Sequence, residues 1–309
     1  MDRPRILPSD NSRTCDKLLR TMRTLKLVGV IAATIITAIT ISAQARQAGG
    51  RGNAFAGIDW NKPFPAHKII GNMYFVGSEQ LGSFLITTPE GHILINSDYE
   101  ETVPVIRAAV EKLGFKFTDI KILLGSHAHP DHVTGDAMVK QLTGATVMAM
   151  AEDVPALNNI RPGGKAHPID RVLHDGDTVS LGGTTLTAHL TPGHTKGCTT
   201  WTFKTTENGK TYDVVVVGSL SLNAANLGDN PAYPNIREDF IKSFKVMRSL
   251  PADVFVGSHN GFYQMAQKYA QLEKGGPNPF IDPAGYKALV DSSEKAFLDR
   301  VEELNRERK

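Results

Sequence analysis

The feature that most constrains this chain is a cluster of three histidines and one aspartate within six residues. The cluster begins three residues after the apolar segment Ile122–Leu124 and contains His127, His129, Asp131 and His132. Loops at strand ends are where a rigid scaffold presents chemistry. Burying so many ionisable groups is costly, and a divalent metal ion removes much of that cost. The cluster therefore predicts a fold that holds a metal site at the end of a strand.

Two more histidines stand in the same setting. His194 follows a segment that ends at Leu190, and His259 follows Val254–Val256, each after a turn that contains glycine. The chain has 10 histidines, so five remain outside this pattern. For those five we expect solvated or hydrogen-bonded imidazoles: His67, His92, His167, His174 and His189.

Six candidate ligands are enough for two zinc sites with three protein ligands each. Imidazole nitrogen and carboxylate oxygen favour zinc, and a catalytic zinc keeps one position open for water. A structural zinc is the alternative, but structural sites favour cysteine, and the chain has only Cys15 and Cys198. Cys198 is expected to be a small buried packing residue, with a reactive thiol as the alternative. The pattern therefore predicts a hydrolytic site with two zinc ions per chain.

Short β-branched segments alternate with longer amphipathic ones along the chain. Met73–Val76, Phe84–Thr87 and His92–Ile95 predict an antiparallel meander, and Val103–Leu113 predicts a helix that Gly114 ends. Two rounds of strands followed by helices predict an α/β fold of four layers (αββα), with two mixed sheets packed face to face and helices outside. Further strands are expected at Ile122–Leu124, Thr146–Met150, Thr178–Leu181, Thr185–Leu190, Val214–Val217 and Val254–Val256, and further helices at Gly135–Leu142, Arg237–Ser249 and Pro283–Arg308.

The N-terminal residues predict export. Three basic residues between positions 20 and 26 precede the apolar run Leu27–Ile41, which Ala43-Gln44-Ala45 follows as a cleavage site. A membrane anchor is the alternative, but the run is shorter than the ~20 apolar residues that a spanning helix needs. We therefore expect residues 1–45 to be a secretory signal, with Met22 as an alternative start. Residues 46–309 are expected to form one catalytic domain in the periplasm.

Charge and composition narrow the partners. The 309 residues are 41% apolar, which suits one large globular domain. The formal net charge is +2, and residues 1–45 contribute +4 of it through seven basic and three acidic residues, which leaves −2 for the rest. No basic surface for nucleic acid is implied. We expect a monomer that binds a small-molecule substrate. Once the signal is removed, we expect it not to bind a membrane.

The His/Asp run at positions 127–132, with His194 and His259 downstream, resembles the ligand signature of the metallo-β-lactamase superfamily. The resemblance extends roughly from Lys68 to Phe262. The same scaffold serves thioester hydrolases, lactonases, nucleases and β-lactamases, so the signature alone does not choose the substrate. A scaffold that binds zinc without catalysis, as a carrier or receptor, is an alternative of another class.

The resemblance also implies a role for each of the six ligands. A hydroxide shared by two zinc ions would be the nucleophile, and Asp131 would be the catalytic residue that orients it and accepts or relays its proton. By position, one zinc would be held by His127, His129 and His194, and the other by Asp131, His132 and His259.

The segment that follows Val214–Val217 separates the substrate classes. The resemblance implies an aspartate that bridges the two metals in glyoxalase-type thioester hydrolases and lactonases, but this chain has Gly218 at that position. Subclass B1 β-lactamases have a cysteine one position later, whereas subclass B3 enzymes have a serine there and a replacement histidine ligand, as Ser219 and His132 would provide. A subclass B3 β-lactamase that hydrolyses penicillins, cephalosporins and carbapenems and confers antibiotic resistance is therefore expected. A lactonase or thioesterase is the alternative.

The same segment predicts a substrate-binding group. Ser219 and Ser221 are expected to bind the carboxylate of the β-lactam, because hydroxyl donors make charge-assisted hydrogen bonds to an anion. Asn223 is a further candidate for this pocket, and ordinary loop hydroxyls are the alternative. An apolar wall is expected from one of three residues: Phe84, Ile160 or Tyr233.

Two residues depart from the family pattern, Asn96 and Gly218. Gly218 stands where an aspartate commonly precedes the subclass B3 serine. The segment Ile93–Ile95 is normally followed by an aspartate that supports the loop carrying the ligands at positions 127–132, which we call the metal loop. This chain has an amide there. An amide can both donate and accept, so the geometry is expected to survive while the electrostatic influence on the histidines weakens.

Overall fold

The computed structural model describes residues 57–222 and 227–308. The expected signal at residues 1–45 and the candidate Asn223 lie outside this part of the chain. All the elements described here belong to one compact unit, Asp59–Lys309. Among the described residues, no helix combines the length and apolar character that crossing a membrane requires.

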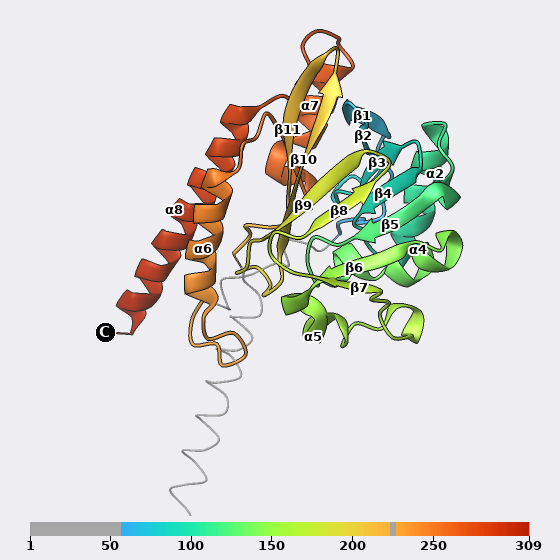
Figure 1. Cartoon of the computed structure of the whole chain (residues 1–309). Coiled ribbons are helices and arrows are strands. Elements are labelled where there is room, and N and C mark those ends of the chain that lie inside the picture. The colour runs from blue at the N-terminus through green and yellow to red at the C-terminus, as the bar shows by residue number, and fades with distance from the viewer. Residues whose placement is uncertain (1–56, 223–226, 309) are drawn as a thin grey trace, which may run out of the picture. The chain divides into compact units, whose positions relative to one another are not determined.

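The first sheet has seven strands in the order of the chain (Figure 1). They are β1 (His67–Ile70), β2 (Met73–Phe75), β3 (Phe84–Thr88), β4 (Gly91–Ile95), β5 (Ile120–Leu124), β6 (Thr146–Met150) and β7 (Arg171–Leu173). The strands from β1 to β4 are antiparallel, and those from β4 to β7 are parallel. Parallel neighbours need a crossover, which α2 (Val103–Lys112) and α4 (Asp136–Thr143) provide. The carboxyl ends of β4, β5 and β6 therefore meet at one edge.

The second sheet has five strands in the order β12-β11-β10-β9-β8. They are β8 (Thr178–Leu181), β9 (Thr184–Leu190), β10 (Thr199–Glu207), β11 (Lys210–Val217) and β12 (Val254–Gly257). Only β11 and β12 are parallel, and α6 (Ile236–Ser249) connects them. The turn between β8 and β9 uses Gly182 and Gly183 at φ of 51° and 87°, a backbone conformation that favours glycine.

Successive side chains of the first sheet point to opposite faces, and both faces are buried. Ile93 and Ile95 of β4 join the core that also contains residues of the second sheet, such as Trp201. Leu94, between them, joins a separate core with Ile106 of α2. A strand with both faces covered is expected to be apolar throughout, as β4 is. This alternation places the first sheet between the second sheet and α2.

Helices close the other side of the second sheet. In Figure 1, α6 and α8 (Pro283–Glu307) run alongside it, on the side away from α2 and α4. Phe240 and Phe244 of α6 pack against Phe297 of α8 with ring centroids 5.4 and 5.7 Å apart. The expected architecture of two mixed sheets with helices outside is confirmed.

The shorter helices connect these layers. The α-helices are α3 (Pro130–Val133), α5 (Val154–Leu157) and α7 (Met265–Leu272). The 3-10 helices are η1 (Glu100–Thr102), η2 (Phe117–Asp119), η3 (Ala151–Asp153), η4 (Pro162–Gly164) and η6 (Asn260–Tyr263). The strands β1, β7 and β10 and the helix α7 were not among the elements expected from the sequence.

Candidate metal centre

Three strands deliver the candidate ligands. β5 ends at Leu124, and the loop after it carries His127 and His129 and runs into α3, which contains Asp131 and His132. His194 lies in the loop after β9, and His259 directly follows Ser258 after β12. The first sheet therefore supplies four of the six ligands and the second sheet supplies two.

His127, His129 and His194 form the first cluster. Their ring centroids lie 4.6 to 4.8 Å apart in all three pairs. The Nδ1–H of His194 donates to the carbonyl oxygen of Ser221 at 2.9 Å, which leaves Nε2 for a metal. His127 is 3% exposed, and its Nε2 is buried with no hydrogen-bond partner among the described residues. A buried nitrogen acceptor without a hydrogen-bond partner is what we expect of a side chain whose partner is a metal ion.

Asp131, His132 and His259 form the second cluster. The two Nε2 atoms lie 3.2 Å apart, and Oδ2 of Asp131 lies 3.4 and 3.6 Å from them. At zinc–nitrogen distances of ~2.0–2.1 Å, two donors of a tetrahedral site are about 3.3–3.4 Å apart. The spacing of this cluster therefore fits a zinc-sized ion without rearrangement.

The two clusters adjoin each other through His127 and His132, whose ring centroids are 4.3 Å apart. In each cluster the possible ligand atoms lie within 4.8 Å of one another. The six side chains predicted from the sequence are therefore brought together as two neighbouring groups of three. Five imidazoles and one carboxylate are a donor set that suits a divalent metal, typically zinc.

Burial and neighbouring imidazoles lower the pKa of four of these histidines. Desolvation, followed by the charges of neighbouring imidazoles, holds the pKa of His127 and His132 well below the usual range. Desolvation is also the main cause that lowers the pKa of His194 to about 4. For His259, desolvation lowers the pKa while the Asp131 carboxylate opposes it. Neutral imidazole is the form that binds a metal, so the site is ready for one at neutral pH.

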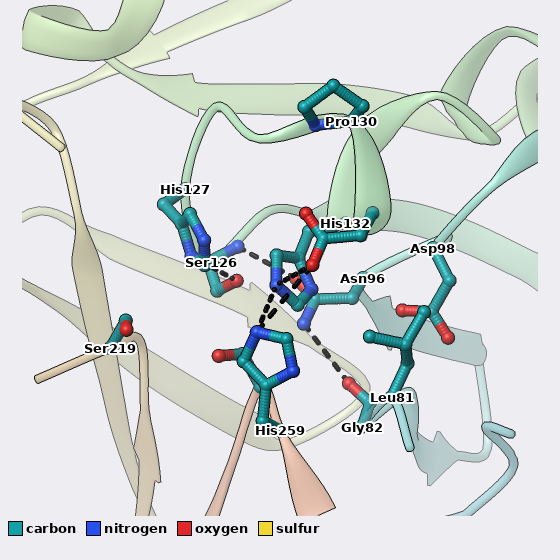
Figure 2. A network of polar contacts seen from close by, with 12 residues as sticks. Leu81, Gly82, Asn96, Asp98, Ser126, His127, Pro130, His132, Ser219 and His259 are labelled. Carbon is teal, nitrogen blue, oxygen red and sulfur yellow. Dashed lines mark hydrogen bonds and ion pairs between the residues drawn. The ribbon is translucent and has the colours of Figure 1, made fainter. Parts of the chain in front are cut away.

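Asn96 supports the metal loop as expected. Figure 2 shows its side chain between the Gly82 and Ser126 segments. Its Nδ2 donates to the carbonyl oxygen of Gly82 at 3.1 Å, and its Oδ1 accepts the N–H of Ser126 at 2.8 Å. The amide uses both of its functions, and an aspartate would supply only the acceptor.

The backbone around Asn96 is strained. Asn96 and Asp98 have φ of 62° and 56°, in the left-handed region that side chains other than those of Asn and Asp rarely enter. Asp98 is fully buried, and desolvation raises its pKa to about 8, although the Ser83 hydroxyl donates to it at 2.7 Å. Between them, Ser97 donates to Asp136, which faces His167 at 3.1 Å. Such local strain is typical of functional loops.

The predicted substrate-binding residues have different settings. Ser219 is 1% exposed, and its Oγ accepts the backbone N–H of Ser221 at 3.2 Å. Ser221 is half-buried and adjoins the first cluster through its carbonyl oxygen. Ser221 is thus the more accessible of the two hydroxyls, and Asn223 lies outside the described residues. Cys198 is buried, as expected, and burial raises the pKa of its thiol.

One of the three residues expected in the apolar wall of the site does not line it. Phe84 is completely buried between the sheets and packs against Phe75, so it cannot line an open site. Its position in the strand-forming run Phe84–Thr88 already indicated a core role. Ile160 packs beside Ala128 in the metal loop, and the hydroxyl of Tyr233 lies 3.5 Å from the carbonyl oxygen of Thr195, so both remain candidates.

Trp60 is a site residue that sequence reasoning missed. Its ring lies edge-on to His259, with centroids 6.3 Å apart, and it is only half-buried. Trp60 is one of two tryptophans and lies outside any strand or helix pattern. A rare aromatic residue in an irregular segment was the available signal, because such residues are enriched at binding surfaces.

The other histidines stay out of the ligand clusters. Several are buried in other contacts. His67 donates from Nδ1 to the carbonyl oxygen of Pro65 at 2.8 Å, and Nε2 of His189 contacts the Thr202 hydroxyl at 2.7 Å. His67, His92 and His167 are each 7% exposed, so they are packed inside the protein and are not solvated.

Comparison with known proteins identifies the family. Residues 82–259 match the family described as the metallo-beta-lactamase superfamily, a match that spans more than half of the chain. The chain belongs to the metallo-beta-lactamase superfamily. It is therefore a hydrolase of that superfamily with a site for divalent metal.

Solved structures of subclass B3 metallo-β-lactamases resemble this chain over most of their length. The native FEZ-1 enzyme of Legionella gormanii is 47% identical, covers 79% of this chain and 98% of its own, and superposes with a TM-score of 0.76. The BJP-1 enzyme of Bradyrhizobium japonicum, a subclass B3 metallo-β-lactamase, is 34% identical, covers 81% of this chain and 98% of its own, and gives a TM-score of 0.75.

The curated relatives carry a different name. A hydroxyacylglutathione hydrolase of Hyphomonas neptunium is 31% identical over 147 residues, which are 48% of this chain and 49% of that protein. Another from Cereibacter sphaeroides is 27% identical over 56% of this chain and 59% of its own length. The chain thus spans about half the length of these curated relatives.

Replacing Asn96 by alanine is expected to destabilise the metal-free protein. The change leaves the buried Ser126 N–H and Gly82 carbonyl without partners, at a cost of about 1–3 kcal/mol for each group. Asn96→Asp keeps the acceptor but loses the donor, so we expect a smaller loss. Urea unfolding of the metal-free variants measures both. An alanine variant as stable as the parent would show that the two bonds contribute nothing.

The metal-free protein is expected to lose stability as the pH falls from about 6.5 toward 4. Because His194 has a lowered pKa in the folded state, the unfolded chain binds its proton more readily over this range. Each such proton contributes about 1.4 kcal/mol per pH unit. Urea unfolding at pH 7 and pH 5 measures the slope. We expect a smaller slope for His194→Gln, while the exposed His174→Gln serves as the control; equal slopes in all three proteins would contradict the assignment.

Proposed function

We propose that this chain is a subclass B3 metallo-β-lactamase that uses two zinc ions to hydrolyse the amide bond of penicillins, cephalosporins and carbapenems. The observation that carries the proposal is the packing around Gly218, where the thioester-hydrolase pattern of the family would place a bridging aspartate. A Cβ on Gly218 would lie 2.8 Å from the Cys198 sulfur and closer still to the Thr199 carbonyl oxygen. There is no room for a carboxylate at this position, which argues against a thioester hydrolase. Ser219 and His132 then favour subclass B3, even though Gly218 also replaces the aspartate that commonly precedes the serine in that subclass.

The proposed ligands are the two clusters described above. Zinc ions held there would lower the pKa of a water molecule toward neutrality and so supply the nucleophile. His127, His129 and His194 would hold the first ion, and Asp131, His132 and His259 would hold the second. Asp131 carries the only carboxylate of the six, so it is the group that orients the attacking water and accepts its proton.

The substrate contacts would come from the loop after β11. Ser221 lies beside the first cluster and is more exposed than Ser219. Its hydroxyl can donate to the carboxylate of a bicyclic β-lactam, and Ser219 would hold the loop in shape through the Ser221 N–H. Asn223 stays a candidate from the sequence alone, because it lies outside the described residues. These serines are binders in this proposal, because the nucleophile is water.

The extent of the similarity to known proteins also supports this proposal. The subclass B3 structures match nearly the whole length of their own chains, whereas the hydroxyacylglutathione hydrolases match over about half of theirs. The second candidate, a thioester hydrolase, is supported by the names of those relatives. A shared fold and shared ligands explain that similarity without a shared substrate.

A substrate panel tests the proposal. The zinc-loaded protein is expected to hydrolyse a carbapenem with a kcat/KM that exceeds those for S-lactoylglutathione and an acyl-homoserine lactone on the order of 100-fold or more. Ser221→Ala is expected to raise KM for the carbapenem roughly 10-fold, because it removes one charge-assisted hydrogen bond. Spectrophotometric initial rates measure each activity.

Matched controls accompany the panel. Ser249→Ala changes an exposed serine hydroxyl on α6 that donates to the Val246 carbonyl, and it should leave KM unchanged. Chelation with dipicolinate should abolish all activity, and added zinc should restore it. Thioester hydrolysis faster than carbapenem hydrolysis would replace the proposal with the second candidate.

We further propose that residues 1–45 are a cleaved secretory signal and that the mature protein is a periplasmic monomer that confers β-lactam resistance. Expressed in a Gram-negative host, the protein is expected in the periplasmic fraction with Arg46 as its first residue. Intact-mass measurement locates the N-terminus, and multi-angle light scattering gives the oligomeric state. A full-length mass in the cytoplasmic fraction would refute the signal assignment.

A further inference from the structure

Asp153 lies between the two loops that carry the first cluster. It ends η3, which follows β6, and its side chain is 3% exposed. Oδ2 accepts the N–H of Ala128 at 2.8 Å and the hydroxyl of Thr195 at 2.9 Å. Oδ1 accepts the N–H of Gly197 at 2.7 Å. One carboxylate thus joins a residue between His127 and His129 to two residues that follow His194.

Gly197 shows how closely the second loop approaches this carboxylate. A Cβ on Gly197 would lie 2.6 Å from Cβ and 2.7 Å from Cγ of Asp153. Any side chain at position 197 would push the His194 loop away. The glycine therefore allows a contact that the carboxylate then fixes.

Asp153 has no basic partner within ion-pair distance in the described part of the chain. Desolvation raises its pKa, while the hydrogen bonds from Gly197, Ala128 and Thr195 oppose that rise. Burying a carboxylate against three neutral donors is costly unless the donors are held in a fixed arrangement. A side chain that only filled space would not need this arrangement, since an apolar residue would do so at lower cost.

We propose that Asp153 is a positioning residue for the first metal: it sets the separation between the His127/His129 loop and the His194 loop. Its hydrogen bonds go to Ala128, Thr195 and Gly197, none of which is a ligand, and the one candidate ligand among the charges that influence it is His129 of the first cluster. Its removal is therefore expected to weaken binding at the first cluster selectively. The proposal concerns metal binding alone, so it does not depend on which substrate is hydrolysed.

Asp153→Asn is the informative change because it keeps the size of the side chain. An amide has one oxygen and one nitrogen, so in either orientation its NH₂ group faces a backbone N–H, that of Gly197 or that of Ala128. One loop then loses its acceptor. Asp170→Asn is the matched control, since Asp170 also accepts one backbone N–H, from Val147 at 2.8 Å, and one side-chain donor, from Lys140. The contacts of Asp170 lie near the start of β6, whereas Asp153 follows the end of that strand.

Thr195 gives a second and milder test. Thr195→Val removes only the hydroxyl that reaches Oδ2, and Thr195→Ser retains it. If the link through Asp153 positions the loops, the valine variant should show part of the effect and the serine variant should recover it. Because each change is small, these variants test the proposal even if Asp153→Asn fails to fold.

Zinc titration of the full-length mature protein, followed by long-range ¹H–¹⁵N spectra of the histidine rings, reports occupancy residue by residue. We expect Asp153→Asn to lower zinc affinity at His127, His129 and His194 by roughly 10–100-fold, the usual effect of removing a group that orients ligands. His132 and His259 should keep their parent affinity, as should all five rings in Asp170→Asn.

The outcomes separate the proposal from its alternatives. Selective loss at the first cluster, with partial loss in Thr195→Val and recovery in Thr195→Ser, supports it. Equal loss at both clusters, or no loss in a folded Asp153→Asn protein, overturns it, and if Asp153→Asn does not fold, parent-like binding by Thr195→Val overturns it. Failure of the parent to bind zinc at all would instead refute the two-zinc site of the proposed function.

Discussion

The close packing of five imidazoles, two of them buried and three half-buried, is the constraint on which this structure depends. Rings as close as His127 and His132 cannot all carry charge, and desolvation holds the pKa of both well below the usual range. Two buried nitrogens of these rings, Nε2 of His127 and Nδ1 of His132, have no hydrogen-bond partner among the described residues. The arrangement is therefore stable only to the extent that the scaffold forces it, and a divalent metal converts this cost into binding energy.

The scaffold imposes this arrangement through the contact between its two sheets. β5 delivers His127 and His129 from the first sheet, while β9 and β12 deliver His194 and His259 from the second. The relative position of the sheets is thus also the geometry of the site. Trp201, in the core between them, donates from its indole N–H to the carbonyl oxygen of Gly125 at 3.1 Å, at the start of the metal loop. Hydrophobic packing and ligand placement are coupled in this one side chain.

The strand ends and the six ligands could be predicted because their signals are local. An apolar run, a glycine turn and a histidine within a few residues define each ligand loop. The groups that support those loops could not be predicted in this way. Asp153 looks like any acidic residue in a turn, and its partners Thr195 and Gly197 lie 42 and 44 positions away in the sequence. Trp60 is 199 positions from His259 in the sequence. The strand β10 was missed because three of its buried positions carry polar side chains, Thr199, Thr200 and Thr205, which hide the apolar pattern of a strand.

Backbone packing accounts for the absence of a carboxylate at position 218. Gly218 lies against Thr199, and the N–H of Thr199 donates to the carbonyl oxygen of Ser126, the residue before His127. Gly218 itself accepts a hydrogen bond from the hydroxyl of Ser258, the residue before His259. A side chain at position 218 would therefore displace a segment that is tied to ligands of both clusters. A bridging carboxylate cannot be introduced here by one substitution, because the space that it needs is occupied by the contacts that hold the other ligands in place.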